Sequence, residues 1–133
     1  MKVLPDDLLY SREHFWVRVD GNLATIGITD YAQDKLGEAL SIELPEIEAY
    51  IERDEPFGIV ESATKGTVEL ISPVSGEVVS VNEDLMDDIG IVNSDPHDTG
   101  WMIVVDVSDP DEFDDLLDSN GYNDFLAEET EID

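Results

Sequence analysis

A lysine between two apolar segments is the residue whose type and position most clearly suggest chemistry. Lys65 is one of three lysines in the chain, and it stands in the segment Ala63-Thr64-Lys65-Gly66. One apolar stretch leads into this segment, and a second leads out of it to a Pro-Val-Ser-Gly turn. The pattern predicts a β-hairpin with a lone ammonium at its tip. A lysine presented in this way can enter the active site of another protein. A purely solubilising role is less convincing here, because the surrounding sequence is acidic.

The charge of the chain excludes some classes of partner. The 133 residues, enough for one domain with one modest core, include 34 acids against six Lys and Arg, a formal net charge of −28. Such a surface repels nucleic acids and anionic membranes. The acidity has two explanations: adaptation to high salt, or docking of basic partners. The acids are spread along the whole chain, which favours adaptation to salt.

The absence of cysteine and the polar residues near the N-terminus limit the chemistry and the cellular compartment that we expect. With no cysteine, the chain has no disulfide, thiolate nucleophile or Cys-ligated metal. The first ten residues contain two acids and a proline where a signal peptide needs an apolar segment, and no apolar run is long enough to span a membrane. We therefore expect a cytoplasmic protein without membrane contact.

Alternating apolar residues and turn signals predict a mainly β domain. Strands are expected at 14–19 and 23–28, joined by Asp20-Gly21-Asn22, then at 40–44, on both sides of Lys65, at 77–81 and at 99–107. A short helix is expected from an N-cap at Asp30 to Gly37, and another helix or turn over 82–91. A C-terminal helix is expected to begin at Asp109 and to continue towards Leu126. One domain over residues 1–127 would then precede an acidic tail at 128–133.

Several ordered motifs resemble one family, the H protein of the glycine cleavage system, which is a lipoyl-lysine carrier. The resemblance runs from about Tyr10 to Leu126. It is carried by His14-Phe15-Trp16-Val17, Ala24 to Gln33, Leu36-Gly37, Glu43-Leu44-Pro45, Val60-Glu61-Ser62, Pro73 to Val78, Val92 to Pro96 and Gly100-Trp101. It implies a hybrid barrel-sandwich with short helices and a C-terminal helix.

The resemblance also implies what each part of the hairpin does. Lys65, eight residues before Pro73, matches the lysine that carries covalently attached lipoate. The residues expected to shape and present its turn are Glu61, Ser62, Thr64, Gly66 and Glu69. A carrier of this kind is not an enzyme, needs no catalytic residue or metal, and is expected to be a monomer.

Two departures from the family pattern bear on the cargo. Ala63 and Thr64 separate Glu-Ser from the lysine, where the family has one residue. Phe15 stands where the family has a glutamate that lines the cleft for the loaded arm, whereas Glu69 retains an acid after the lysine. Phe15 is either a core aromatic or an apolar wall of that cleft, beside Glu13. An apolar wall suits an uncharged or sulfur-bearing cargo better than an ammonium.

These departures favour, by a small margin, a related carrier over a true glycine cleavage H protein. That carrier is the lipoate-binding protein of the heterodisulfide-reductase-like sulfur oxidation pathway, whose partner would be the heterodisulfide-reductase-like complex. The alternative carries an aminomethyl group between glycine decarboxylase and aminomethyltransferase, with dihydrolipoyl dehydrogenase as a third partner. Both readings require a lipoate attachment enzyme.

Other functions fit the sequence less well. A biotin carrier usually places its lysine between two methionines, and Lys65 has Thr64 and Gly66. A calcium loop starting at Asp118 would have Glu129 at its twelfth position but Asn123 instead of glycine at its sixth. A hydrolase is not indicated, because Ser62 and Ser75 are turn or strand serines with no histidine nearby in the sequence. A protein of the same fold that has lost the modification remains the strongest alternative.

Overall fold

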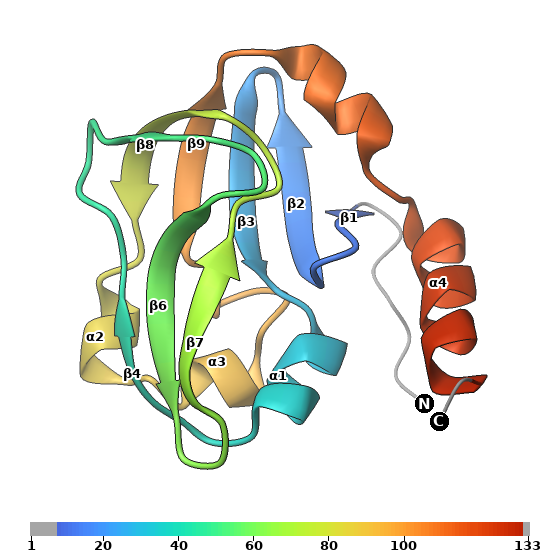
Figure 1. Cartoon of the computed structure of the whole chain (residues 1–133). Coiled ribbons are helices and arrows are strands. Elements are labelled where there is room, and N and C mark those ends of the chain that lie inside the picture. The colour runs from blue at the N-terminus through green and yellow to red at the C-terminus, as the bar shows by residue number, and fades with distance from the viewer. Residues whose placement is uncertain (1–7, 132–133) are drawn as a thin grey trace.

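The computed structural model describes residues 8–131, which form two antiparallel sheets with short helices at their ends (Figure 1). The six-stranded sheet has the order β1-β2-β3-β9-β8-β5, and the three-stranded sheet has the order β4-β6-β7. The strands are β1 Leu9–Tyr10, β2 Phe15–Asp20, β3 Leu23–Ile28, β4 Ala39–Glu43, β5 Tyr50–Ile51, β6 Pro56–Ser62, β7 Gly66–Ile71, β8 Gly76–Val81 and β9 Ile103–Val107. The expected strands are therefore present, although β9 begins four residues after Thr99.

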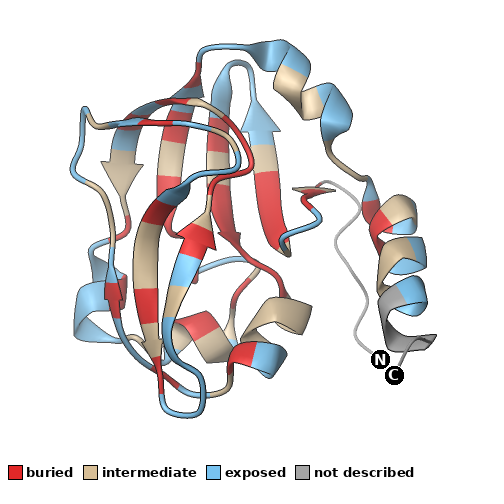
Figure 2. Ribbon diagram, in the orientation of Figure 1, coloured by how far each residue is buried: buried red, intermediate tan, exposed pale blue. Residues whose placement is uncertain are grey.

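The core lies mainly between the two sheets, where inward-facing residues of each strand meet (Figure 2). Val17, Ile26, Val78 and Val105 have no exposed surface. Strand β2 is buried on both faces, since Trp16 belongs to a second cluster with Leu8, Tyr10 and Tyr122. This second cluster packs the C-terminal helix against the outer side of the six-stranded sheet.

The short helix α1, Asp30–Leu36, is the element that later forms one wall of the site. Its N-cap is Thr29 rather than the expected Asp30, because Thr29 has the extended backbone and its hydroxyl accepts from the N–H of Ala32. Gly37 ends the helix as expected, with a φ of 77° and its N–H donating to the Gln33 carbonyl. The N–H of Ala32 and the carbonyl of Gln33, at the two ends of α1, thereby have partners.

The expected single helices after β8 and β9 are each divided. Residues 82–91 contain the one-turn helix α2, Asp84–Asp87, and the first residue of a second one-turn helix, α3 Ile91–Ser94. After β9, Asp109 caps a 3-10 helix, η1 Pro110–Asp115, and the separate helix α4 spans Ser119–Glu131. The chain is extended between them because Leu117 exchanges two backbone hydrogen bonds of 2.7 Å with Tyr10. Helix α4 thus runs beyond residue 127.

Polar contacts hold η1 against the sheets. The Glu112 carboxylate accepts from the backbone N–H of Ser75 at 2.7 Å and from its hydroxyl at 3.0 Å. Arg53 donates to Asp115 at 2.5 Å, and this hydrogen bond raises the pKa of Arg53 above its ordinary value.

Within residues 8–131, no helix is long and apolar enough to cross a membrane.

Candidate functional site

Lys65 lies in the turn of the hairpin formed by β6 and β7, at the end of the molecule where α1 also lies (Figure 1). Ser62 pairs with Gly66 as the last pair of the hairpin, so Ala63, Thr64 and Lys65 form the turn. Gly66 has a φ of 74°, a backbone conformation that favours glycine. Lys65 is exposed to solvent, as the expected display of an ammonium requires.

Ser62 organises the backbone of this turn from a buried position. Its hydroxyl donates to the Leu36 carbonyl at 2.5 Å and accepts from the N–H groups of Thr64 and Lys65 at 3.2 and 3.1 Å. Glu61 lies one residue earlier, and its carboxylate accepts from the Thr67 hydroxyl at 2.8 Å across the hairpin. The Glu-Ser pair therefore shapes the turn through two different contacts.

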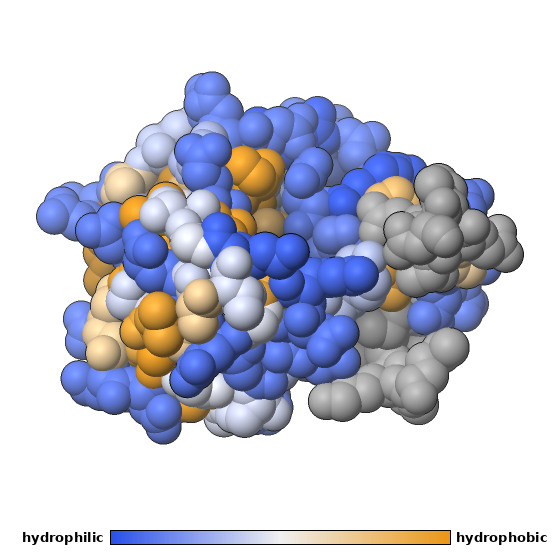
Figure 3. Space-filling view, turned by 60° about the horizontal axis from the view of Figure 1, so that its bottom comes forward, coloured by the Kyte–Doolittle hydropathy of each residue, from blue (hydrophilic) through white to orange (hydrophobic). Residues whose placement is uncertain are grey.

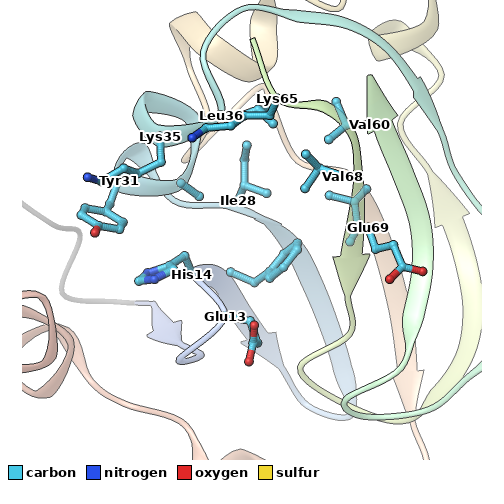
Figure 4. Close-up of a pocket in the computed structure, with 13 residues that line it drawn as sticks. Glu13, His14, Ile28, Tyr31, Lys35, Leu36, Val60, Lys65, Val68 and Glu69 are labelled. Carbon is cyan, nitrogen blue, oxygen red and sulfur yellow. The ribbon is translucent and has the colours of Figure 1, made fainter. Parts of the chain in front are cut away.

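A cavity of about 540 Å³, here called the arm cleft, opens beside Lys65 between α1, the start of β2 and the hairpin (Figure 4). Its apolar wall consists of Phe15, Ile28, Ala32, Leu36, Val60, Val68 and Leu70. Its polar and aromatic rim consists of Glu13, His14, Tyr31, Lys35, Lys65 and Glu69. In Figure 4 the two lysines lie at one end of the arm cleft, and the two glutamates lie at the other. The same end of the molecule, viewed in Figure 3, has hydrophobic patches between hydrophilic side chains.

The structure brings four of the expected site residues together in the arm cleft and places the others in the hairpin beside it. Lys65, Glu69, Glu13 and Phe15 all line the arm cleft. Phe15 is both a core aromatic and an apolar wall of the arm cleft: it is only 4% exposed, and it lines the arm cleft. Its ring packs edge-to-face on Phe57, with centroids 5.7 Å apart. The remaining expected residues, Glu61, Ser62, Thr64 and Gly66, shape the hairpin and are not part of the cleft lining.

Residues of α1 and His14 also line the arm cleft and were not expected from the sequence. Tyr31 and Lys35 are four residues apart, as are Ala32 and Leu36, which is the spacing of one helix face. That spacing could have indicated a shared face, but not what the face covers. His14 has a φ of 71°, and its ring contacts Tyr31 at a centroid distance of 4.6 Å.

His14 also connects the arm cleft to α4. Its Nδ1 and the Tyr122 hydroxyl are 2.8 Å apart, and the same hydroxyl is 2.8 Å from the Thr29 hydroxyl. Thr29 in turn caps α1. The fully buried Tyr122 therefore joins α4, α1 and the turn before β2 through one oxygen atom.

We expect Tyr122→Phe to lower the free energy of unfolding by about 1–3 kcal/mol, because it removes a buried hydroxyl from two partners. Urea unfolding monitored by tryptophan fluorescence measures the change. Tyr50→Phe is the matched control: Tyr50 is 59% exposed, and its hydroxyl bonds to the exposed Ser108. Equal, small losses for both variants would contradict the role given to Tyr122.

Comparison with known proteins identifies the family. The family model described as "Glycine cleavage H-protein" matches residues 8–129. The chain belongs to the glycine cleavage H-protein family. It is 49% identical over 131 residues to the glycine cleavage system H protein of Carboxydothermus hydrogenoformans, covering 98% of this chain and 100% of that protein. It is 52% identical over 124 residues to the H protein of Brevibacillus brevis, covering 93% and 98%.

A solved structure supports the same assignment. The crystal structure of a glycine cleavage system H protein from Mycobacterium marinum matches with a TM-score of 0.80 at 29% identity, covering 93% of this chain and 99% of that chain. This confirms the predicted fold class and the resemblance noted in the motifs. Members of this H-protein family are non-catalytic carriers with lipoate attached covalently to a lysine.

The comparisons also bear on the choice between the two pathways. The relatives described above are all named glycine cleavage system H proteins. The preference for a sulfur-oxidation carrier, and for the heterodisulfide-reductase-like complex as its partner, has no support among them. The alternative reading, a true glycine cleavage carrier, is the better supported one.

Proposed function

We propose that this chain is the H protein of a glycine cleavage system, with lipoate amide-linked to Lys65. It would carry the aminomethyl group from glycine decarboxylase to aminomethyltransferase, and dihydrolipoyl dehydrogenase would reoxidise the arm. The observation that carries this proposal is the exposed Lys65 on a hairpin turn beside an arm cleft of about 540 Å³. We keep the cytoplasm as the expected compartment.

The residues at the site fit a lipoyl group. The Lys65 side chain is exposed, so an attachment enzyme can reach its amine. The volume of the arm cleft lies within the roughly 300–1,000 Å³ typical of small-molecule sites. Apolar side chains such as Val60, Val68 and Leu70 offer a surface for an alkyl chain. When bound, the lipoyl group supplies the pair of sulfur atoms that accepts and releases the cargo.

The charged rim of the arm cleft suits the proposed cargo. An aminomethyl group is cationic at neutral pH, and Glu13 and Glu69 offer carboxylates at the end of the cleft away from Lys65 (Figure 4). Lys35 at the other end repels a cation, whereas Lys65 loses its charge when its amine forms the amide with lipoate. These charges would thus favour a cargo position away from Lys65, the root of the arm, where the lipoyl group is attached. Phe15 does not prevent this, because these two acids remain.

We expect Glu69→Gln to speed the spontaneous loss of the aminomethyl group from the loaded protein about twofold to fivefold. The reason is that an exposed ion pair contributes about 0.2–1 kcal/mol. Ammonia released in the absence of partner enzymes measures this rate. Glu77→Gln is the matched control, because Glu77 lies on β8 and outside the arm cleft. A rate unchanged from that of the unsubstituted protein would argue against a role for Glu69 in holding the cargo.

The proposal is tested by mass spectrometry of the protein purified from its own source. A mass increase of one lipoyl group, mapped to the peptide that contains Lys65, would support a carrier role. Loading by glycine decarboxylase and discharge by aminomethyltransferase would then identify the pathway. A lipoylated protein that neither enzyme accepts would point back to a different cargo, whereas an unmodified Lys65 would overturn the proposal.

A further inference from the structure

The lysine turn makes hydrogen bonds to the C-terminal end of α1 and to Glu38, which follows that helix. The Thr64 hydroxyl donates to the Leu36 carbonyl at 3.1 Å, alongside the Ser62 hydroxyl. The N–H of Ala63 donates to the Glu38 carbonyl at 2.9 Å. Leu36 is the last residue of α1, and its carbonyl is one of the four at a helix end that lack partners within the helix. The hairpin therefore caps the C-terminus of α1.

Gly37 provides the space for the contact made by Thr64. A Cβ placed on Gly37 would lie 2.7 Å from the Thr64 hydroxyl oxygen, which is too close for an ordinary contact. The positive φ of Gly37 also turns the chain away from the helix at this point. The glycine therefore lets the hydroxyl approach the Leu36 carbonyl.

This contact connects the backbone that carries Lys65 to one wall of the arm cleft. Helix α1 contributes Tyr31, Ala32, Lys35 and Leu36 to the cleft lining. Thr64 directly precedes Lys65, so its hydrogen bond restricts the residue from which the arm extends. A carbonyl has two lone pairs, and the hydroxyls of Ser62 and Thr64 can both bond to the Leu36 oxygen. The Ser62 hydroxyl also accepts from two N–H groups of the turn. The Thr64 hydroxyl, in contrast, belongs to the residue next to the lysine and bonds to α1.

We propose that Thr64 is a positioning residue that holds the root of the lipoyl arm against α1, so that the loaded arm lies in the arm cleft. This inference rests on the proposed function for the arm, but the hydrogen bond itself belongs to the unmodified chain. Without this bond, the Ser62 hydroxyl still joins the turn to the Leu36 carbonyl and keeps the hairpin intact. The residue next to Lys65 is no longer held, so this part of the turn moves more freely relative to α1. The cargo is then less sheltered from water.

The first test uses the full-length protein without lipoate and amide hydrogen exchange. The Ala63 amide reports opening of the turn from the segment that directly follows α1, because it donates to the Glu38 carbonyl. Thr64→Val should speed its exchange roughly 2- to 10-fold, as expected for one net hydrogen bond. Thr64→Ser should restore the original rate. Thr67→Val is the matched control, because it removes the Thr67–Glu61 contact of the same hairpin and leaves the contacts to α1 in place.

The second test uses the lipoylated, aminomethyl-loaded protein without partner enzymes. Hydrolysis converts the thioether and water to a free thiol, formaldehyde and ammonium. Thr64→Val should release ammonium roughly 2- to 10-fold faster, and Thr64→Ser should match the unsubstituted protein. An unchanged rate for either measurement in Thr64→Val, or a Thr64→Ser variant as fast as Thr64→Val, would overturn the inference. If Lys65 carries no lipoate, the proposed function fails, and the exchange measurement still tests the contact.

Discussion

Lys65→Arg is expected to remove the lipoyl group completely and to reduce glycine cleavage to the background of the assay. Arginine retains the positive charge at the turn, but its guanidinium is not an amine that can be acylated with lipoate. The substitution changes an exposed side chain, so we expect less than about 0.5 kcal/mol of change in stability. Intact mass after coexpression with an attachment enzyme measures the modification, and glycine-dependent reduction of NAD by the reconstituted system measures the activity.

Lys35→Arg is the matched control for attachment. Lys35 is also exposed and lies at the same end of the arm cleft, but it extends from helix α1 rather than from a hairpin turn (Figure 4). It should leave the mass increase of one lipoyl group unchanged. A lipoyl group retained by Lys65→Arg and lost by Lys35→Arg would mean that the attachment site had been assigned to the wrong lysine.

The sequence predicted most of the β architecture because its signals are local. Alternating apolar residues mark β2 and β3, and Gly21 marks the turn between them. The ends of the helices were harder to predict. Thr29 and Asp30 are both good N-cap residues, and only the backbone geometry decides between them. The break before α4 depends on Leu117 pairing with Tyr10, which is more than a hundred residues away in the chain. Local helix signals contain no information on such a pairing.

The hairpin of the candidate site was predictable, but its surroundings were not. A glycine after Lys65 and apolar strands on both sides are short-range features. The arm cleft is lined by residues of three segments, 13–15, 28–36 and 60–70, that are distant in the chain. Helical spacing relates Tyr31 to Lys35 without indicating what lies opposite them. The bond between Thr64 and the Leu36 carbonyl is equally non-local, because it spans 28 residues.

At position 15 this chain has a phenylalanine where the resemblance implies a glutamate that lines the cleft. Glutamate at this position would add a carboxylate to the arm cleft, and on that ground alone Phe15→Glu would improve retention of a cationic cargo. The ring, however, belongs to the core: it is 4% exposed and packs on Phe57. Removing a buried phenylalanine costs about 3–5 kcal/mol. A carboxylate placed there also loses hydration, which adds to this cost.

We therefore expect Phe15→Glu to lower the free energy of unfolding by more than about 3 kcal/mol. Burial should raise the pKa of the introduced carboxyl above that of the unfolded chain, near 4.3. The loss should then be smallest below about pH 4, where both states are protonated, and should grow as pH rises above it. Urea midpoints at several pH values measure this dependence. Phe15→Leu, which stays apolar, should show a smaller loss with little dependence on pH. A loss below about 1 kcal/mol for Phe15→Glu, with slower loss of the aminomethyl group, would instead mean that this position belongs to the arm cleft more than to the core.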